Sequence, residues 1–245
     1  AVVLGPFLSL LIVQYTSFDV LFIVLSVIVT IGALLALTVK TSDLPKPMHV
    51  ERNFKFGLHD LFEKKALPLA GLAALIAFAY AGVLSFLSLY AEQQNLLAAA
   101  SYFYAVYAVA MMSVRPMTGK IYDTLGAKFV IIPSFVLFAI GLAILANADS
   151  TWIFLVSAVF IGAGFGTLNT SFQSLCIQAT TPQRTGYATA TYFTLFDVGI
   201  ALGSFVFGIV AVNFSYAMIY YLSAVLVVVV FAIYMLLFVR NKKMA

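Results

Sequence analysis

An acidic side chain inside an otherwise uncharged apolar segment is the feature of this sequence best suited to chemistry. Asp197 lies near the middle of residues 188–212, and a carboxylate at such a position costs about 2.5 to 3.5 kcal/mol to place in hydrocarbon. Thr194 shares its predicted helical face. A carboxylate in apolar surroundings can bind and release a proton, which makes Asp197 a candidate coupling or substrate-binding group. The alternative is an acid that a structural partner, such as a tyrosine hydroxyl, neutralises.

Amide side chains form a second candidate group in the apolar segment 152–177. Gly162, Gly166, Asn169 and Gln173 follow one another at i, i+4, i+7 and i+11, so they share one stripe of a helix. Amides in an apolar medium need partners or water, so we expect this stripe to face other helices or a wet cavity. Structural contact between helices is the alternative to solute binding.

Aromatic and thioether side chains form a third candidate group. Tyr104, Tyr107 and Met111 form one stripe of residues 97–114, and Tyr80 lies in the middle of residues 67–90. Surfaces of this kind hold apolar or cationic organic molecules by stacking and soft packing. Ordinary packing between helices is the alternative interpretation.

Composition decides what kind of element carries these residues. The 245 residues are 64% hydrophobic and 9% charged, against about 25% charged in a soluble domain. Crossing a bilayer takes about 20 apolar residues in a helix, because backbone polar groups in lipid must be satisfied within the segment. Seven stretches qualify, and we predict an all-α polytopic membrane protein. The stretches are Val20–Val39, Leu67–Tyr90, Leu97–Val114, Phe129–Ala146, Trp152–Ile177, Ala188–Val212 and Ala217–Val239.

The first apolar run, residues 1–13, is too short to span a bilayer. At about 1.5 Å per residue it covers about 20 Å. It lacks the basic start of a secretory signal, and the chain does not begin with Met. We therefore expect the second half of a helix, in a chain whose N-terminal portion is missing.

The basic residues predict the orientation in the membrane. All 13 Lys and Arg residues fall in alternate connections, namely residues 40–66, 115–128, 178–187 and those after 239. The charged residues of the intervening connections are all acidic. By the positive-inside rule the basic set is cytoplasmic. The net charge of +4 is then a consequence of topology, and we expect no nucleic-acid partner. We predict a multi-pass protein of the cell membrane with the central loop and the C-terminus in the cytoplasm.

A motif in the second of these basic connections resembles a known family. The run Arg115-Pro-Met-Thr-Gly119-Lys-Ile-Tyr-Asp123-Thr-Leu-Gly126-Ala-Lys128 resembles the RPxxGxxxDRxGRK loop between helices eight and nine of the major facilitator superfamily. Residues 182–186 resemble that family's connection between helices ten and eleven. Gly5 and Pro6 resemble the end of the antiporter motif of helix five, although Ser9 and Leu10 replace its usual glycines.

The resemblance covers the whole chain and implies a register. Residues 1–39 would be the end of helix five and helix six of the N-terminal half, residues 40–66 the central cytoplasmic loop, and residues 67–245 the six-helix C-terminal transport half. Helices seven, eight, ten and eleven would line a central cavity, and six, nine and twelve would face lipid. Asp123 would accept hydrogen bonds from the start of a neighbouring helix, closing the cytoplasmic side, and Gly119 and Gly126 would permit its close approach.

We therefore expect a secondary active transporter that works by alternating access, with proton-coupled efflux of small organic molecules as the leading function. Its partners would be a small-molecule solute, protons or another coupling ion, membrane lipid, and an N-terminal half that transport requires. The alternatives are a non-transporting truncated product or membrane-embedded interaction module, and uptake of a sugar or metabolite by the same fold. We expect no enzyme, cofactor or metal site, because no nucleophile has a nearby base and neither histidine has ligand spacing.

Overall fold

The computed structural model describes residues 9, 12, 16–38 and 62–239. The chain forms two compact units, residues 1–57 and 58–245. Gly5, Pro6, both histidines and most of the central loop lie outside the described residues. The described end of that loop, residues 62–66, forms a bend and a turn.

The first unit contains one described helix, α2, which runs from Phe18 to Thr38. Its apolar composition is interrupted by hydroxyl side chains that bond to the helix itself. Ser26 donates to the carbonyl of Phe22 at 2.7 Å, and Thr30 donates to the carbonyl of Ser26 at 2.8 Å. Because these hydroxyls find partners within one turn, the helix can present them to an apolar medium.

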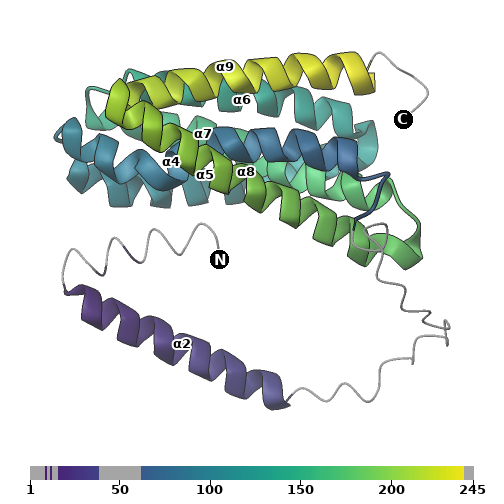
Figure 1. Cartoon of the computed structure of the whole chain (residues 1–245), viewed down its shortest axis with the longest axis horizontal. Coiled ribbons are helices and arrows are strands. Elements are labelled where there is room, and N and C mark those ends of the chain that lie inside the picture. The colour runs from purple at the N-terminus through teal and green to yellow at the C-terminus, as the bar shows by residue number, and fades with distance from the viewer. Residues whose placement is uncertain (1–8, 10–11, 13–15, 39–61, 240–245) are drawn as a thin grey trace. The chain divides into compact units, whose positions relative to one another are not determined.

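The second unit is a bundle of six long helices that lie side by side (Figure 1). Short connections join consecutive helices, and a 3-10 turn, η1 (Pro182–Arg184), precedes α8. The last helix continues into a π-helical turn, η2 (Met235–Val239). The six helices are α4 (Leu67–Gln93), α5 (Leu97–Leu125), α6 (Ala127–Ala146), α7 (Thr151–Gln178), α8 (Thr185–Asn213) and α9 (Tyr216–Tyr234).

Seven helices in the described part of the chain are long and apolar enough to cross a membrane. This confirms the predicted all-α polytopic fold, and each predicted span corresponds to one helix. The largest difference is in α5, which runs to Leu125 where the sequence predicted a span ending at Val114. Hydropathy marks where a helix leaves lipid, but backbone hydrogen bonding continues into the polar region beyond it.

Single residues at the connections explain how helices reverse direction so tightly. Gly126 alone separates α5 from α6, and its φ of 96° is a conformation that glycine adopts without a steric penalty. Asn95, with φ of 58°, turns the chain between α4 and α5. The hydroxyl of Ser215 caps α9 by accepting from the backbone N–H of Met218 at 3.2 Å.

Helix packing places α7 near the centre of the bundle. It contacts α5 and α6 extensively, and it also touches α4 and α8. The helix α4 packs mainly on α8 and α9, and α6 also packs on α9. The core between these helices is rich in aromatic rings. The largest fully buried side chains include Tyr90, Tyr192, Tyr220, Phe103, Phe135, Phe138, Phe154 and Phe172.

Candidate functional site

The two faces of α8 have opposite characters. On one face, an added Cβ at Gly199 would overlap the carbonyl oxygen of Ala74, and one at Gly203 would lie 2.6 Å from the carbonyl oxygen of Phe78. These glycines therefore let α4 and α8 pack with their backbones in close contact. Gly199 and Gly203 are buried, whereas Asp197 is exposed, so the carboxylate lies away from this contact.

Asp197 and Thr194 are both exposed in the isolated chain. They lie on the side of α8 that the other described helices leave uncovered, which we call its open face. Within residues 16–38 and 62–239, the carboxylate of Asp197 makes no hydrogen bond or ion pair. A charged group in the middle of an apolar helix costs free energy unless it meets water, a partner or a proton. The described part of the bundle supplies no protein partner for this carboxylate.

Asn169 lies where α4, α7 and α8 meet. The hydroxyl of Tyr192 donates to the Asn169 side-chain oxygen at 2.5 Å and to its backbone carbonyl at 2.8 Å. Both residues border a narrow pocket together with Ala73, Ile76, Leu168, Phe172 and Phe196. Gln173, one turn further along α7, is partly exposed. The structure therefore shows a structural partner for the Asn169 oxygen.

The three tyrosines predicted as cavity walls lie inside the bundle. Tyr80 and Tyr107 are each 2% exposed and Tyr104 is 4% exposed. The ring of Tyr80 stacks on Phe165 of α7, with 3.7 Å between ring centroids. The hydroxyl of Tyr104 donates to the carbonyl of Val83 at 3.4 Å. These contacts favour the packing alternative over a solute-binding wall in this conformation.

The segment resembling the family loop is helical. Residues 115–125 form the last turns of α5, so only Gly126 is a connection. This corrects the expectation of a loop, because the segment keeps its backbone hydrogen bonds after it leaves the apolar span. Arg115, Gly119 and Asp123 then fall on one side of α5, at spacings of four residues.

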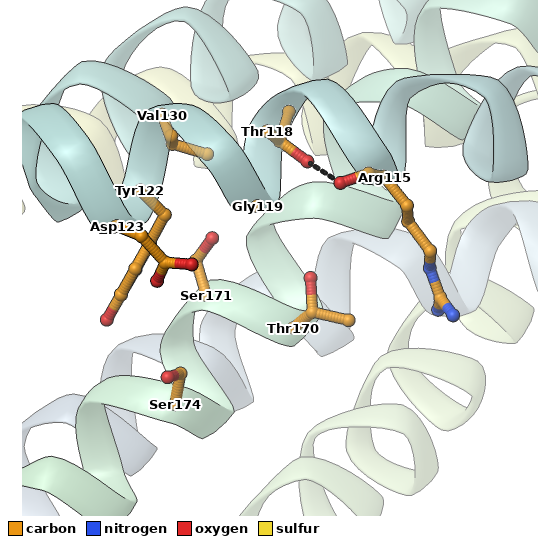
Figure 2. Close-up of a pocket in the computed structure, with 9 residues that line it drawn as sticks. All are labelled: Arg115, Thr118, Gly119, Tyr122, Asp123, Val130, Thr170, Ser171 and Ser174. Atoms are coloured by element: carbon orange, nitrogen blue, oxygen red, sulfur yellow. Dashed lines mark hydrogen bonds between the residues drawn. The ribbon is translucent and has the colours of Figure 1, made fainter.

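These three residues border a pocket of about 340 Å³ whose lining residues are mostly of polar type (Figure 2). Asp123 and Arg115 lie at opposite ends of the pocket, and hydroxyls of α7 lie between them and beneath them. A Cβ added at Gly119 would meet nothing within 4 Å, so the close approach implied for this glycine is not made within the described bundle. Gly126 and Lys128 lie outside the lining. The other lining residues are Thr118, Tyr122, Val130, Thr170, Ser171 and Ser174.

Sequence reasoning missed an ion pair between Glu63 and Arg184. Glu63 is 6% exposed, and its carboxylate accepts a hydrogen bond from Nε of Arg184. That hydrogen bond lowers the pKa of Glu63 below its usual value of 4.5, against the opposing effect of burial. The only signal in the sequence was that Arg184 is the single basic residue of its connection.

Comparison with known proteins shows the family of this chain. The sequence matches the model of the Major Facilitator Superfamily over residues 1–204 and 104–245. It is 28% identical over 151 residues to an uncharacterized MFS-type transporter of Methanocaldococcus jannaschii, covering 61% of this chain and 39% of that protein. It is also 28% identical over 108 residues to the riboflavin transporter RibZ of Clostridioides difficile, covering 43% of this chain and 24% of that protein. The matched regions thus span well under half the length of these relatives, but the family match extends along the whole chain. The chain belongs to the Major Facilitator Superfamily.

Proposed function

We propose that the protein carrying this chain is a secondary active transporter that exports small organic molecules in exchange for protons. The observation that carries the proposal is the position of Asp197. It is an unpaired carboxylate, within the described residues, on the open face of a membrane-spanning helix of a transporter family. A carboxylate there can be neutralised by a proton or by a cationic solute, and the two would compete for it.

The mechanism would be alternating access about a site near the middle of the membrane. In this proposal the residues 67–245 form one six-helix half, and the open face of α8 turns toward a second half. The glycine face of α8 is already occupied by α4, so the Asp197 face is the one left for a solute. Thr194 would add a hydroxyl contact, and Asn169 and Gln173 would add amide contacts from α7.

The tyrosines would contribute indirectly. Tyr80, Tyr104 and Tyr107 are buried within the bundle, so we assign them the role of holding α4, α5 and α7 together. Direct contact with a solute would require these rings to move out of the packing described above.

The pocket lined by Arg115, Gly119 and Asp123 would be the place where the two halves make contact and close the cytoplasmic side. Asp123 is exposed there, and Gly119 leaves space beside it. A helix N-terminus from the second half could approach this space and donate hydrogen bonds to the carboxylate, because its partial positive charge favours an anion. Arg115, Gly126 and Lys128 would complete the motif. The orientation that puts this pocket, the central loop and the C-terminus in the cytoplasm of a cell-membrane protein follows from the distribution of basic residues.

A second solute class follows from one relative. RibZ of Clostridioides difficile is a riboflavin transporter, so a planar heteroaromatic metabolite is an alternative to a cationic drug-like molecule. Phe172, Tyr192 and Phe196 lie around Asn169 and would stack on such a ring system only after the helices separate, because Phe172 and Tyr192 are buried.

The proposal is tested by Asp197→Asn in membrane vesicles that contain the full-length protein. We expect solute-dependent proton flux to fall to the background of vesicles without the protein, while membrane insertion is unchanged. Asp149→Asn is the matched control, because Asp149 is an exposed acid at the connection before α7, and it should retain wild-type flux. Cationic dyes and riboflavin serve as the two solutes. Wild-type flux in the Asp197→Asn variant, with both solutes, would overturn the assignment.

A further inference from the structure

One acidic residue outside the membrane spans joins two parts of the chain that are far apart in sequence. Glu63 precedes α4, and its carboxylate pairs with Arg184 in the connection before α8. Its backbone N–H donates to the hydroxyl of Thr191, inside α8, at 2.8 Å. Its backbone carbonyl accepts from the N–H groups of Ala66 and Leu67 at 3.0 and 3.2 Å, where α4 begins.

The carboxylate and the backbone N–H of Glu63 therefore connect the segment before α4 to the beginning of α8. The guanidinium of Arg184 is fixed in turn by the ring of Tyr187, with 4.8 Å from Cζ to the ring centroid. The carboxylate of this pair is largely shielded from water, because the side chain of Glu63 is 8% exposed, whereas that of Arg184 is 40% exposed. Removing the acid would break the ion pair between the segment before α4 and the connection before α8.

The same two helices are joined further along their lengths. Gly199 packs on Ala74, and Gly203 packs on Phe78 four residues further along both helices, so α4 and α8 run in the same direction. The hydroxyl oxygens of Ser85 and Ser204 lie 2.8 Å apart. Contacts between α4 and α8 thus begin before the first turn of α4 and continue to Ser85. From Leu67 to Ser85 the helix is roughly 27 Å long, at about 1.5 Å per residue.

We propose that Glu63 is a positioning residue that fastens α4 and α8 into one rigid pair, which moves as a unit during transport. This inference rests on the proposed function, because a rigid pair matters only if other helices move around it. The physical reason is that backbone contact through glycines and an ion pair at the end leave the pair few alternative arrangements. Asp197 is carried by α8, so its position would depend on a residue at the end of the central loop.

The first experiment joins the two helices covalently. The variant Ser85→Cys with Ser204→Cys places two sulfurs where hydroxyl oxygens are already 2.8 Å apart, which is compatible with disulfide geometry. The native Cys176 is buried and is retained, and each single-cysteine variant is a control. We expect oxidised and reduced vesicles to differ in solute flux by no more than about twofold. Loss of flux on oxidation that a reductant reverses would overturn the rigid pair.

The second experiment tests Glu63 itself. Glu63→Gln should lower flux roughly threefold to thirtyfold, the range expected when a coupling contact is removed. Glu92→Gln is the matched control, because Glu92 is an exposed acid at the other end of α4, and it should keep wild-type flux. Restoring flux with the exchanged pair Glu63→Arg with Arg184→Glu would support a positioning role.

A rescue experiment separates positioning from chemistry. If Glu63 acts by holding the helices together, the oxidised Ser85–Ser204 cross-link should restore flux to Glu63→Gln. Flux that stays low in the oxidised triple variant and in the exchanged pair would overturn the proposal. If Glu63→Gln does not insert into the membrane, the oxidation experiment still decides whether the pair is rigid, and flux in the exchanged pair Glu63→Arg with Arg184→Glu decides the role of Glu63. An absence of any solute flux in the reduced, otherwise wild-type protein would instead refute the proposed transport function.

Discussion

The helices α7 and α8 look alike in sequence and differ in their surroundings. Each carries glycines four residues apart and polar side chains in an apolar span. Fourteen of the 28 residues of α7 are buried, whereas six of the 29 residues of α8 are buried. The glycines of α7 meet two neighbours, with Gly162 against Tyr107 of α5 and Gly164 against Phe138 of α6, but those of α8 meet only α4.

The comparison teaches that the same motif can build a core or a boundary. In α7 the small residues let helices close in on two sides, so its polar groups are drawn into internal contacts such as Asn169 with Tyr192. In α8 they seal one side and leave Asp197 on the other. Asn169 of α7 therefore has an internal partner, whereas the carboxylate of Asp197 in α8 has none within the described residues.

The largest expected effect comes from filling the glycine contacts. Gly162→Leu and Gly199→Leu should each destabilise the fold by about 3 kcal/mol or more, because the added side chain meets a backbone carbonyl that cannot move aside. The measurement is the fraction of monodisperse protein after extraction in detergent. Gly208→Leu is the control on α8, since its nearest neighbour is the ring of Phe86 at 3.8 Å. Equal damage from this control would remove the distinction between the two faces of α8.

A smaller difference in stability is expected when polar groups at the two helices are removed. Tyr192→Phe removes the hydroxyl bonds to Asn169 and should lower stability by about 0.5 to 1.5 kcal/mol. Asp197→Asn should leave the melting temperature unchanged or raise it, because it removes a charge from an apolar span. Thermal unfolding in detergent measures both. A clear fall in melting temperature for Asp197→Asn would reveal a structural partner and would make α8 resemble α7.

The smallest expected effect is on the pH dependence of the Glu63 junction. Hydrogen bonding to Arg184 lowers the pKa of Glu63 below 4.5, so the junction contributes stability that is fully present above the unfolded pKa. That contribution is lost only as pH falls through the lower, folded pKa. The difference in melting temperature between wild type and Glu63→Gln should therefore stay constant from about pH 8 to pH 5.5. A difference that changes in this window would show that a group other than Glu63 controls the junction.

Much of the candidate site could be predicted from residue type alone. The position of Asp197 in an apolar span made it a candidate without a structure, whereas the close packing of Gly199 and Gly203 on α4 came from the structure. The tyrosines could not be assigned in the same way. An aromatic stripe has the same sequence pattern whether it lines a cavity or packs against a neighbour such as Phe165. Glu63 was also hidden, because its partner is 121 residues away in the sequence.

Two physical facts divide what the sequence determined from what the tertiary structure decided. Lipid requires each crossing to be a helix of about 20 apolar residues with its own hydrogen bonds, so the number and class of the elements are local properties that can be counted along the chain. Lipid and a protein interior are both apolar, however, so these helices carry little amphipathic pattern to show which side is buried. Only the packed bundle decided that α7 lies inside, that α8 is fastened to α4, and that Glu63 meets Arg184.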